Sequence, residues 1–212
     1  MGREFLDIFD QWADSYDDTV IGHDIEYKEV FSKYEQILAA VADRSSGHVV
    51  EFGVGTGNLT QKLLARGLRV TGIEPSPPMR KIAEAKLDNK AVLLDGDFLQ
   101  FPKVNNIDTF VSTYAFHHLT DDEKANAINH YGSLLSKGGR IVFADTMFES
   151  AADYNHAIVK AKHQGYLNLA KDLETEYYTT IPFLTNILEE NRFSVTFTRF
   201  NDFVWLLDAV KQ

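Results

Sequence analysis

Residues 51–58 read EFGVGTGN and lie between a β-branched apolar run, residues 48–52, and a leucine-rich pattern with helical spacing. This change of periodicity predicts a buried strand that ends in a loop and continues as a helix. Gly53 and Gly55 have no Cβ, so the backbone there can adopt a positive φ and approach a ligand closely. A dinucleotide-binding loop of the form G-x-G-x-x-G would have a glycine where this chain has Asn58. The stretch therefore predicts a ligand-binding strand–loop–helix unit that departs from the dinucleotide pattern.

The same alternation of strand and helix signals continues along the chain. Short apolar runs, typical of strands buried on both faces of a parallel sheet, follow at residues 69–74, 91–95, 107–113 and 140–145. Ser76 precedes Pro77, so the pair predicts an N-cap for a helix that runs to Leu87. Residues 120–123 form a predicted capping box for a helix that runs to Leu135. Alternating strands and helices favour an open α/β sheet with right-handed crossovers.

The end of the chain breaks this rhythm. Two strand-like runs, residues 193–200 and 203–210, are separated only by Asn201 and Asp202, which predicts an antiparallel hairpin. We therefore expect an α/β fold: a Rossmann-like mixed seven-stranded sheet, mainly parallel with a C-terminal antiparallel hairpin. Helices would cover both faces, and an N-terminal helical lid would lie over the carboxyl edge of the sheet, where open α/β sheets bind ligands.

The whole chain, residues 1–212, is expected to form a single domain, because it contains no repeat, low-complexity tract or flexible linker. Within this domain we expect a helical N-terminal lid at 1–47 and a cofactor-binding core at 48–148. A helical insertion over the site would span 149–181, and the last helix and hairpin would span 182–212.

Composition excludes several classes of function. The 212 residues contain 21 Lys and Arg against 31 Asp and Glu, and the net charge of −10 disfavours binding to nucleic acid or an anionic membrane. The chain contains no cysteine, so a disulfide framework, a thiolate metal site and a cysteine nucleophile are all excluded. Neither a signal peptide nor an apolar run long enough to cross a membrane is visible. We therefore expect a cytoplasmic protein.

Acidic residues follow the second and third predicted strands. Glu74 ends the second run, the position at which an open α/β fold presents a carboxylate to the hydroxyls of a ribose. Asp97 and Phe98 follow the third run and could bind the amine and the ring face of an adenine. Glu74 could instead interact with the N-terminus of the next helix, and Asp97 could be an ordinary turn residue.

Together, Glu74, Asp97-Phe98, residues 51–58 and the stretch STYAFHHL at residues 112–119 resemble a class I S-adenosylmethionine-dependent methyltransferase. The resemblance extends from residue 49 to the C-terminal hairpin. The opening FDQWADSYD, residues 9–17, is similar to the N-terminal lid of small-molecule methyltransferases. In length and overall pattern the chain is most similar to the YrrT-type group, whose methyl acceptor is unassigned.

This resemblance implies S-adenosyl-L-methionine as the cofactor. It places Gly53 and Gly55 beside the methionyl part, Glu74 at the ribose hydroxyls and Asp97 at the adenine. Trp12, Tyr16 and Tyr27 would be lid aromatics that cover the sulfonium, unless they pack in the core of an amphipathic helix. The full set of expected cofactor-binding residues is Tyr16, Glu51, Gly53, Gly55, Glu74, Asp97, Phe98 and Thr113.

Methyl transfer from a sulfonium needs alignment of the acceptor and exclusion of water, and it needs a base only for a protonated acceptor. Candidate catalytic residues are His117 and Tyr16, with His118 and Tyr114 as further options. The histidines could equally pack at the strand end. We expect no metal, because adjacent histidines rarely share an ion and no cysteine set or H-E-x-x-H motif accompanies them. His156 and His163 are expected to lie on a solvated helix face.

The expected acceptor is a small molecule. The chain lacks an N/D-P-P-Y/F motif, an appended RNA-binding module and a cysteine for covalent attack on a pyrimidine. Two alternatives remain open at this point: a non-catalytic protein that binds S-adenosylmethionine or S-adenosylhomocysteine, and an NAD-dependent oxidoreductase. Asn58 and the terminal hairpin disfavour the oxidoreductase. The chain would act as a monomer or homodimer.

Overall fold

A computed structural model of the protein describes residues 24–212. Seven strands of the described part form one sheet in the order β3-β2-β1-β4-β5-β8-β7, and a short eighth strand, β6, pairs with β5 beside it. The strands are β1 His48–Phe52, β2 Arg69–Ile73, β3 Val92–Leu94, β4 Thr109–Thr113, β5 Arg140–Phe148, β6 Thr179–Thr180, β7 Phe193–Arg199 and β8 Val204–Lys211. The predicted mixed sheet is confirmed: β1 to β5 run parallel to one another, and β8 runs antiparallel to both β5 and β7.

The strand order reverses between β1 and β4, which pair side by side although β2 and β3 lie between them in the sequence. In an open α/β sheet, loops leave in opposite directions on the two sides of such a point, and a crevice opens beyond the carboxyl ends of the strands. This topology places the loops after β1, β2 and β4 around one ligand-sized space.

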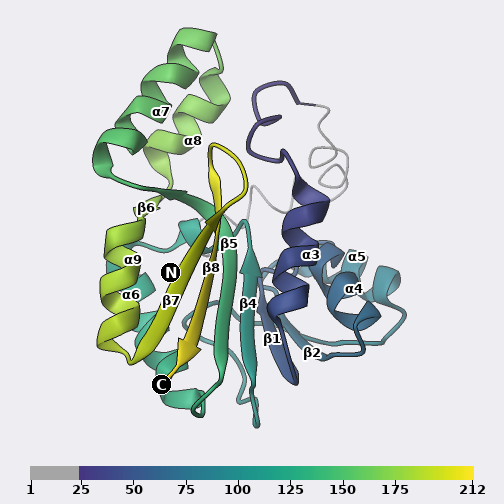
Figure 1. Ribbon diagram of the computed structural model, residues 1–212. Helices are drawn as coiled ribbons and strands as arrows, with labels where there is room; N and C mark the ends of the chain where they lie inside the picture. Colours follow the sequence, from purple (N-terminus) through teal and green to yellow (C-terminus); the bar gives the residue numbers. More distant parts are fainter. Residues whose placement is uncertain (1–23) are drawn as a thin grey trace.

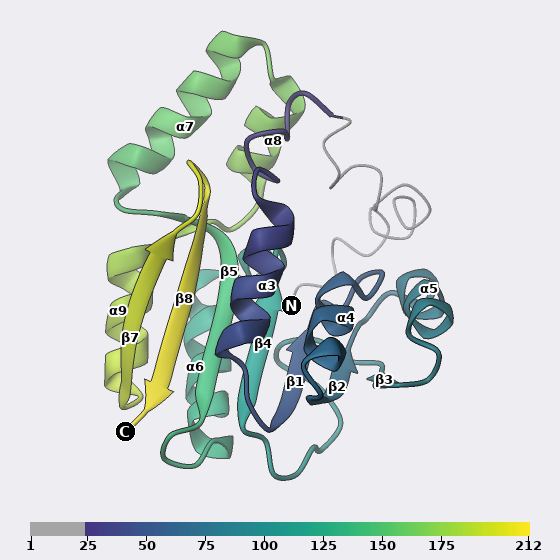
Figure 2. The same cartoon turned by 45° about the vertical axis from the view of Figure 1, so that its right-hand side comes forward.

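Helices cover both faces of the sheet (Figures 1 and 2). On one face α6 and α9 pack against the phenylalanines and isoleucines of β1, β4 and β5. On the other face α3 and α4 pack against the valines of the same strands, and α5 lies beside α4. The helices are α3 Tyr34–Arg44, α4 Asn58–Ala65, α5 Pro77–Leu87, α6 Asp121–Leu134, α7 Ala151–Gln164, α8 Leu167–Thr175 and α9 Ile181–Glu190, with a 3-10 turn, η2, at Phe116–His118.

The helix boundaries follow the capping residues that the sequence offers. The Ser76 hydroxyl accepts from the backbone N–H of Met79 at the start of α5. Thr120 and Glu123 form the predicted capping box of α6, with each side chain accepting from the backbone N–H of the other. These contacts satisfy donors that the first helical turn leaves unpaired. They fix where each helix begins and therefore the length of the loop before it.

An aromatic cluster under the carboxyl edge supports this loop region. Phe52, the last residue of β1, stacks on Phe98 at 5.0 Å and on Phe110 at 5.7 Å between ring centroids. The Tyr131 hydroxyl of α6 donates to the carbonyl of Phe98 at 2.6 Å. Aromatic packing of this kind adds about 0.5–1.5 kcal/mol per pair beyond burial. The loop after β3 is thereby anchored to the core.

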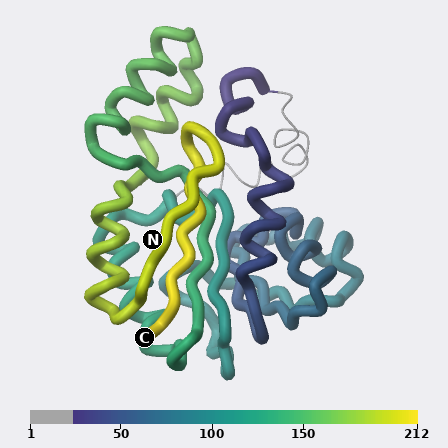
Figure 3. Tube along the Cα trace, viewed as in Figure 1, coloured from purple at the N-terminus to yellow at the C-terminus, as the bar shows by residue number. Residues whose placement is uncertain are grey.

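The helices α7 and α8 extend beyond the edge at which β5 ends, and residues 24–33 lie next to α8 (Figure 3). Glu26 accepts from the backbone N–H groups of Asn168 and Leu169 at 2.8 and 3.1 Å, and so caps the first turn of α8. The Tyr27 hydroxyl donates to Asp172 on the same helix. Two segments that are far apart in the sequence are therefore tied together above the sheet. No helix among the described residues is long and apolar enough to span a membrane.

Candidate functional site

A pocket opens at the carboxyl edge of the sheet, where the loops after β1, β2, β3 and β4 meet. Most of the residues predicted to bind the cofactor contribute to its wall. The lining residues are Gly53, Gly55, Ile73, Glu74, Pro75, Met79, Asp97, Phe98, Thr113, Tyr114, Ala115 and His118. The crevice that the sequence predicts is therefore formed by the predicted segments.

The glycine loop requires glycine for two separate reasons. Gly53 and Gly55 have φ values of 67° and 56°, in the left-handed region that side chains disfavour. A Cβ on Gly53 would lie 2.8 Å from the Cβ of Ala115, which is closer than van der Waals contact. Among the described residues, a Cβ on Gly55 would meet no atom within 4 Å beyond its chain neighbours, and Gly55 itself lines the pocket. The loop thus brings bare backbone to a space of ligand size.

Glu74 links the loop to the neighbouring helix. One carboxylate oxygen accepts from the backbone N–H of Gly55 at 2.8 Å, and the other accepts from the N–H of Ser76 at 2.9 Å. The side chain is only 5% exposed, so these two bonds fix its position in the wall. Glu74 therefore contacts the start of α5, one of the two roles that the sequence suggests, and it also lines the pocket.

Asp97 and Phe98 continue the wall after β3. One Asp97 oxygen accepts from the backbone N–H groups of Leu99 and Gln100, at 2.9 and 2.8 Å, as in an Asx turn. Phe98 is 7% exposed and rests on the aromatic cluster beneath the pocket. An acidic side chain next to an apolar ring is the pairing expected around an adenine.

The wall beyond β4 contains Thr113, Tyr114 and Ala115. Tyr114 has a φ of 54°, and its ring packs against Phe31 and Tyr34 at 5.2 and 5.6 Å. Its hydroxyl is buried and forms no hydrogen bond with another described residue. Burial raises the pKa of this hydroxyl well above its ordinary value, so Tyr114 is neutral. Tyr114 therefore contributes an uncharged aromatic side chain to this part of the pocket wall.

Glu51 takes a different place from the other predicted residues. It lies beneath the loop, 1% exposed, and its carboxylate accepts from the Thr60 hydroxyl of α4 at 2.7 Å. Burial, together with the charge of Glu74, raises its pKa to about 8. It is not among the residues that line the pocket. Trp12 and Tyr16 lie outside the described residues, and Tyr27 lies on the segment that contacts α8.

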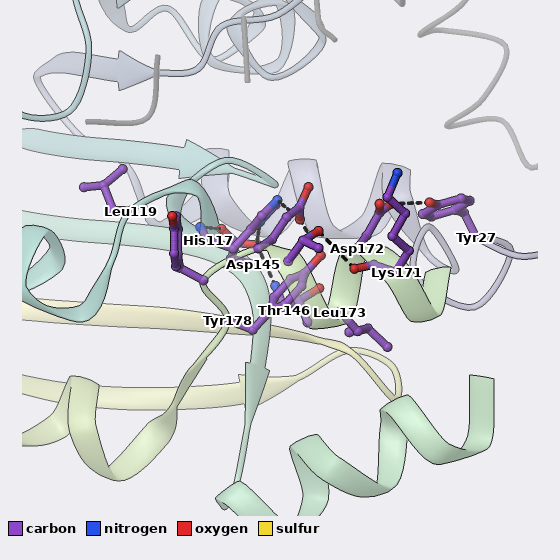
Figure 4. Close-up of polar contacts among 12 residues, drawn as sticks. Tyr27, His117, Leu119, Asp145, Thr146, Lys171, Asp172, Leu173 and Tyr178 are labelled. Carbon is purple, nitrogen blue, oxygen red and sulfur yellow. Dashed lines mark hydrogen bonds and ion pairs between the residues drawn. The ribbon is translucent and has the colours of Figure 1, made fainter. Parts of the chain in front are cut away.

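The two histidines after β4 occupy different environments. His117 donates from Nδ1 to Asp145 at 2.6 Å (Figure 4). Its Nε2 lies 3.2 Å from the carboxylate of Glu176. Burial would lower its pKa, but the two carboxylates raise it to about 10. His118 is on the pocket wall instead, and burial together with the charge on His117 lowers its pKa to about 3. His117 is therefore a charged bridge, whereas His118 is a neutral imidazole beside the pocket.

The partners of His117 were not predicted. We call the group His117, His118, Asp145, Glu176 and Tyr178 the histidine cluster. The Tyr178 ring stacks on His117 at 5.0 Å, and its hydroxyl donates to Glu176 at 2.7 Å. Asp145 ends the fifth predicted strand, just as Glu74 ends the second. The argument that identified Glu74 could therefore have identified Asp145. Glu176 carries no comparable signal.

Known proteins resemble this chain along its whole length. A family model described as a methyltransferase domain matches residues 49–139. An uncharacterised methyltransferase of Geobacillus sp. strain WCH70 is 58% identical over 213 residues, covering 100% of both chains. An uncharacterised methyltransferase of Bacillus licheniformis is 56% identical over 212 residues, again covering 100% of both.

Solved structures resemble the fold. Magnesium protoporphyrin IX methyltransferase from Synechocystis PCC 6803, crystallised with S-adenosylhomocysteine, has a TM-score of 0.77 at 19% identity, over 100% of both chains. A possible histamine N-methyltransferase from Thermotoga maritima has a TM-score of 0.68 at 18% identity, over 98% of this chain and 100% of the other. At these identities the likeness concerns the fold alone.

Proposed function

The chain belongs to the methyltransferase family of these Geobacillus and Bacillus proteins, and we propose that it transfers a methyl group from S-adenosylmethionine to a small-molecule acceptor. The observation that carries the proposal is the bond between Glu74 and the N–H of Gly55 at the pocket wall. This bond holds a carboxylate and a stretch of side-chain-free backbone against the same space. In a nucleoside that carries an amino-acid chain, the ribose hydroxyls complement the carboxylate, and the narrow amino-acid chain fits against the glycine backbone.

We assign the parts of the cofactor to the wall as follows. Glu74 would accept from the ribose hydroxyls, because its carboxylate is held at the pocket wall by the backbone N–H groups of Gly55 and Ser76. Gly53 and Gly55 would lie along the methionyl part, where a Cβ would occupy the ligand's space. Asp97 would accept from the adenine amine, with Phe98 beneath the ring. Thr113 would complete the wall near the sulfonium.

The loop geometry disfavours NAD as the ligand. The third glycine of a dinucleotide loop allows close packing of helix and strand. Here Asn58 takes that position, and its side chain accepts from Lys86 on α5 at 2.8 Å and donates to the Tyr34 hydroxyl at 3.2 Å. The first turn of α4 is therefore built around side-chain contacts.

The chemistry makes few demands on the protein, because the sulfonium supplies an already activated methyl group. The residues around the pocket would orient the acceptor in line and exclude water. We propose that Tyr114 and His118 form the acceptor side, since both line the pocket. His117 was a candidate catalytic residue, but both of its ring nitrogens contact carboxylates. Tyr16 stays a prediction, because it lies outside the described residues.

We further propose that the protein acts in the cytoplasm as a monomer or homodimer. The net charge of −10 supports a small acceptor rather than nucleic acid.

The proposal is tested by thermal unfolding of the full chain with S-adenosylmethionine, S-adenosylhomocysteine or NAD. A ligand at about 100 times its Kd stabilises the folded state by about 2.7 kcal/mol. We expect both S-adenosyl compounds to raise Tm and NAD to leave it unchanged. A rise with NAD alone would favour an oxidoreductase. Binding without turnover across a panel of small nucleophiles would favour the non-catalytic alternative.

A further inference from the structure

Three potential metal ligands converge in the histidine cluster. His117 and His118 belong to the turn η2, and Glu176 follows α8, so two segments far apart in the sequence contribute to one group. One ligand atom from each of the three lies within 4.8 Å of the other two. The group is buried or half-buried and reaches the pocket wall through His118.

The closest pair already has nearly the spacing of two ligands that share an ion. His117 Nε2 and the Glu176 carboxylate are 3.2 Å apart. Two ligands at about 2.0–2.2 Å from a tetrahedral zinc ion lie roughly 3.3–3.6 Å from each other, slightly farther apart than this pair. The rings of His117 and His118 have centroids 4.1 Å apart and an interplanar angle of 58°, so the two imidazoles are in contact without being stacked.

The surrounding contacts orient these ligands as the outer shell of a metal site does. Asp145 binds Nδ1 of His117 at 2.6 Å and is itself held by the backbone N–H groups of Thr146 and His117, at 2.7 and 3.0 Å. This contact keeps a proton on Nδ1 and turns Nε2 towards Glu176. A metal ion bound at Nε2 would displace the proton that this nitrogen carries in the charged bridge, and the proton would be released to solvent. A carboxylate behind a histidine is the usual outer-shell partner of a metal-binding imidazole. Tyr178 fixes Glu176 in the same way, through a bond of 2.7 Å.

We propose that His117, His118 and Glu176 bind one divalent transition-metal ion of the zinc class. Two imidazoles and a carboxylate are ligands that Zn²⁺ and Co²⁺ accept, whereas Mg²⁺ prefers oxygen ligands alone. The positive charge of the ion would neutralise the negative charges of Asp145 and Glu176. Because His118 lines the pocket, an open coordination position would face the side assigned to the acceptor. The inference needs only the cluster and does not depend on the identity of the methyl donor.

The experiment uses the full chain without an affinity tag, stripped with a chelator and titrated with Co²⁺ and then with Zn²⁺. We expect one Co²⁺ per chain with the visible absorption bands of a tetrahedral site, displaced by Zn²⁺ and not by Mg²⁺. Glu176→Gln and His118→Gln should each weaken binding by more than about 100-fold, and Asp145→Asn by about 10–100-fold.

The control is His156→Gln with His163→Gln, a pair of exposed histidines on α7 that should leave the titration unchanged. Circular dichroism and titration with S-adenosylhomocysteine on the same samples separate loss of the metal from loss of the fold or of the donor site. Uptake of less than one ion per wild-type chain, or equal uptake by Glu176→Gln and wild type, would overturn the proposal and leave the cluster as an ion-paired bridge.

Discussion

The two sides of the pocket are built in different ways. On the side of β1 to β3, which we call the donor wall, the defining contacts run from side chains to backbone: Glu74 to Gly55 and Ser76, and Asp97 to its own turn. In the histidine cluster the contacts join side chains from distant segments, such as His117 and Asp145. Backbone N–H groups are positioned by the loop conformation alone, whereas a network of side-chain hydrogen bonds needs every member present. The donor wall therefore tolerates change in its surroundings, and the histidine cluster does not.

The largest effect should come from breaking the histidine cluster. His117→Leu leaves Asp145 and Glu176 buried without the cation between them, and loss of one partner of a buried pair costs about 3–5 kcal/mol. Urea unfolding measures this change, with the exposed His156→Leu as the control. An effect below about 1 kcal/mol would contradict the assignment of His117 as a charged bridge.

The next effect belongs to the donor wall. Glu74→Gln removes the charge from the carboxylate proposed to bind the ribose. Its affinity for S-adenosylhomocysteine should fall by about 1.5–3 kcal/mol, or roughly 10- to 150-fold. Titration calorimetry measures the loss, and Glu84→Gln, an exposed change on α5, is the matched control. Equal affinities of Glu74→Gln and wild type would place the ribose elsewhere.

A pH dependence should originate beneath the donor wall. Burial raises the pKa of Glu51 from 4.5 to about 8, so the folded state holds a proton that the unfolded state has released across this range. The contribution of Glu51 to stability therefore falls as pH rises from 4.5 to 8, by up to about 1.4 kcal/mol per pH unit. Urea unfolding across this window should show a shallower decline in Glu51→Gln. Parallel profiles for the two proteins would mean that Glu51 is ionised in the folded state.

A comparison of substitutions at Gly55 and Gly67 distinguishes the cost of backbone strain from the loss of ligand contact. Gly55 and Gly67 have φ values of 56° and 73°, and at either position an added Cβ meets no atom within 4 Å in residues 24–212 beyond its chain neighbours. Alanine at each should therefore cost about 1–2 kcal/mol of stability. Only Gly55→Ala should also weaken binding of S-adenosylhomocysteine, because only that Cβ enters the pocket. Equal affinities of the two variants in calorimetry would remove Gly55 from the donor wall.

The smallest effect concerns the segment above the histidine cluster. Tyr27→Phe removes the hydroxyl that donates to Asp172 on α8. Loss of a half-buried bond of this kind should lower the free energy of unfolding by about 0.5–1.5 kcal/mol. Phenylalanine at Tyr154, whose hydroxyl donates to the carbonyl of Leu173, gives a comparison within the insertion. If amide hydrogen exchange in α8 is faster in Tyr27→Phe but not in Tyr154→Phe, the bond from the segment before α3 is the one that stabilises α8.

The donor wall could be predicted because its signals are local. Gly53, Gly55 and Glu74 lie at strand ends, and parallel strands bring their carboxyl ends to one edge of the sheet. Glu51 was also predicted to bind the ligand. In the structure it lies beneath the loop and does not line the pocket. Side chains alternate along a strand, so Glu51 faces α4 while its neighbour Phe52 joins the opposite face.

The histidine cluster could be predicted only in part. The sequence places His117 and His118 after the fourth strand, but a 3-10 turn rotates successive side chains by about 120°. Which imidazole faces the pocket therefore depends on the turn, and His117 was chosen where His118 lines the wall. Glu176 and Tyr178 come from the insertion, whose position over the core is set by long-range packing that no local pattern encodes.

The central claim is that the donor wall alone binds the S-adenosyl group. The most direct test is calorimetric titration of wild type, Glu74→Gln and Glu176→Gln with S-adenosylhomocysteine. The account predicts binding to wild type and Glu176→Gln with similar affinity, and binding to Glu74→Gln that is at least about 10-fold weaker. No binding to the folded wild type, or a loss confined to Glu176→Gln, would contradict it.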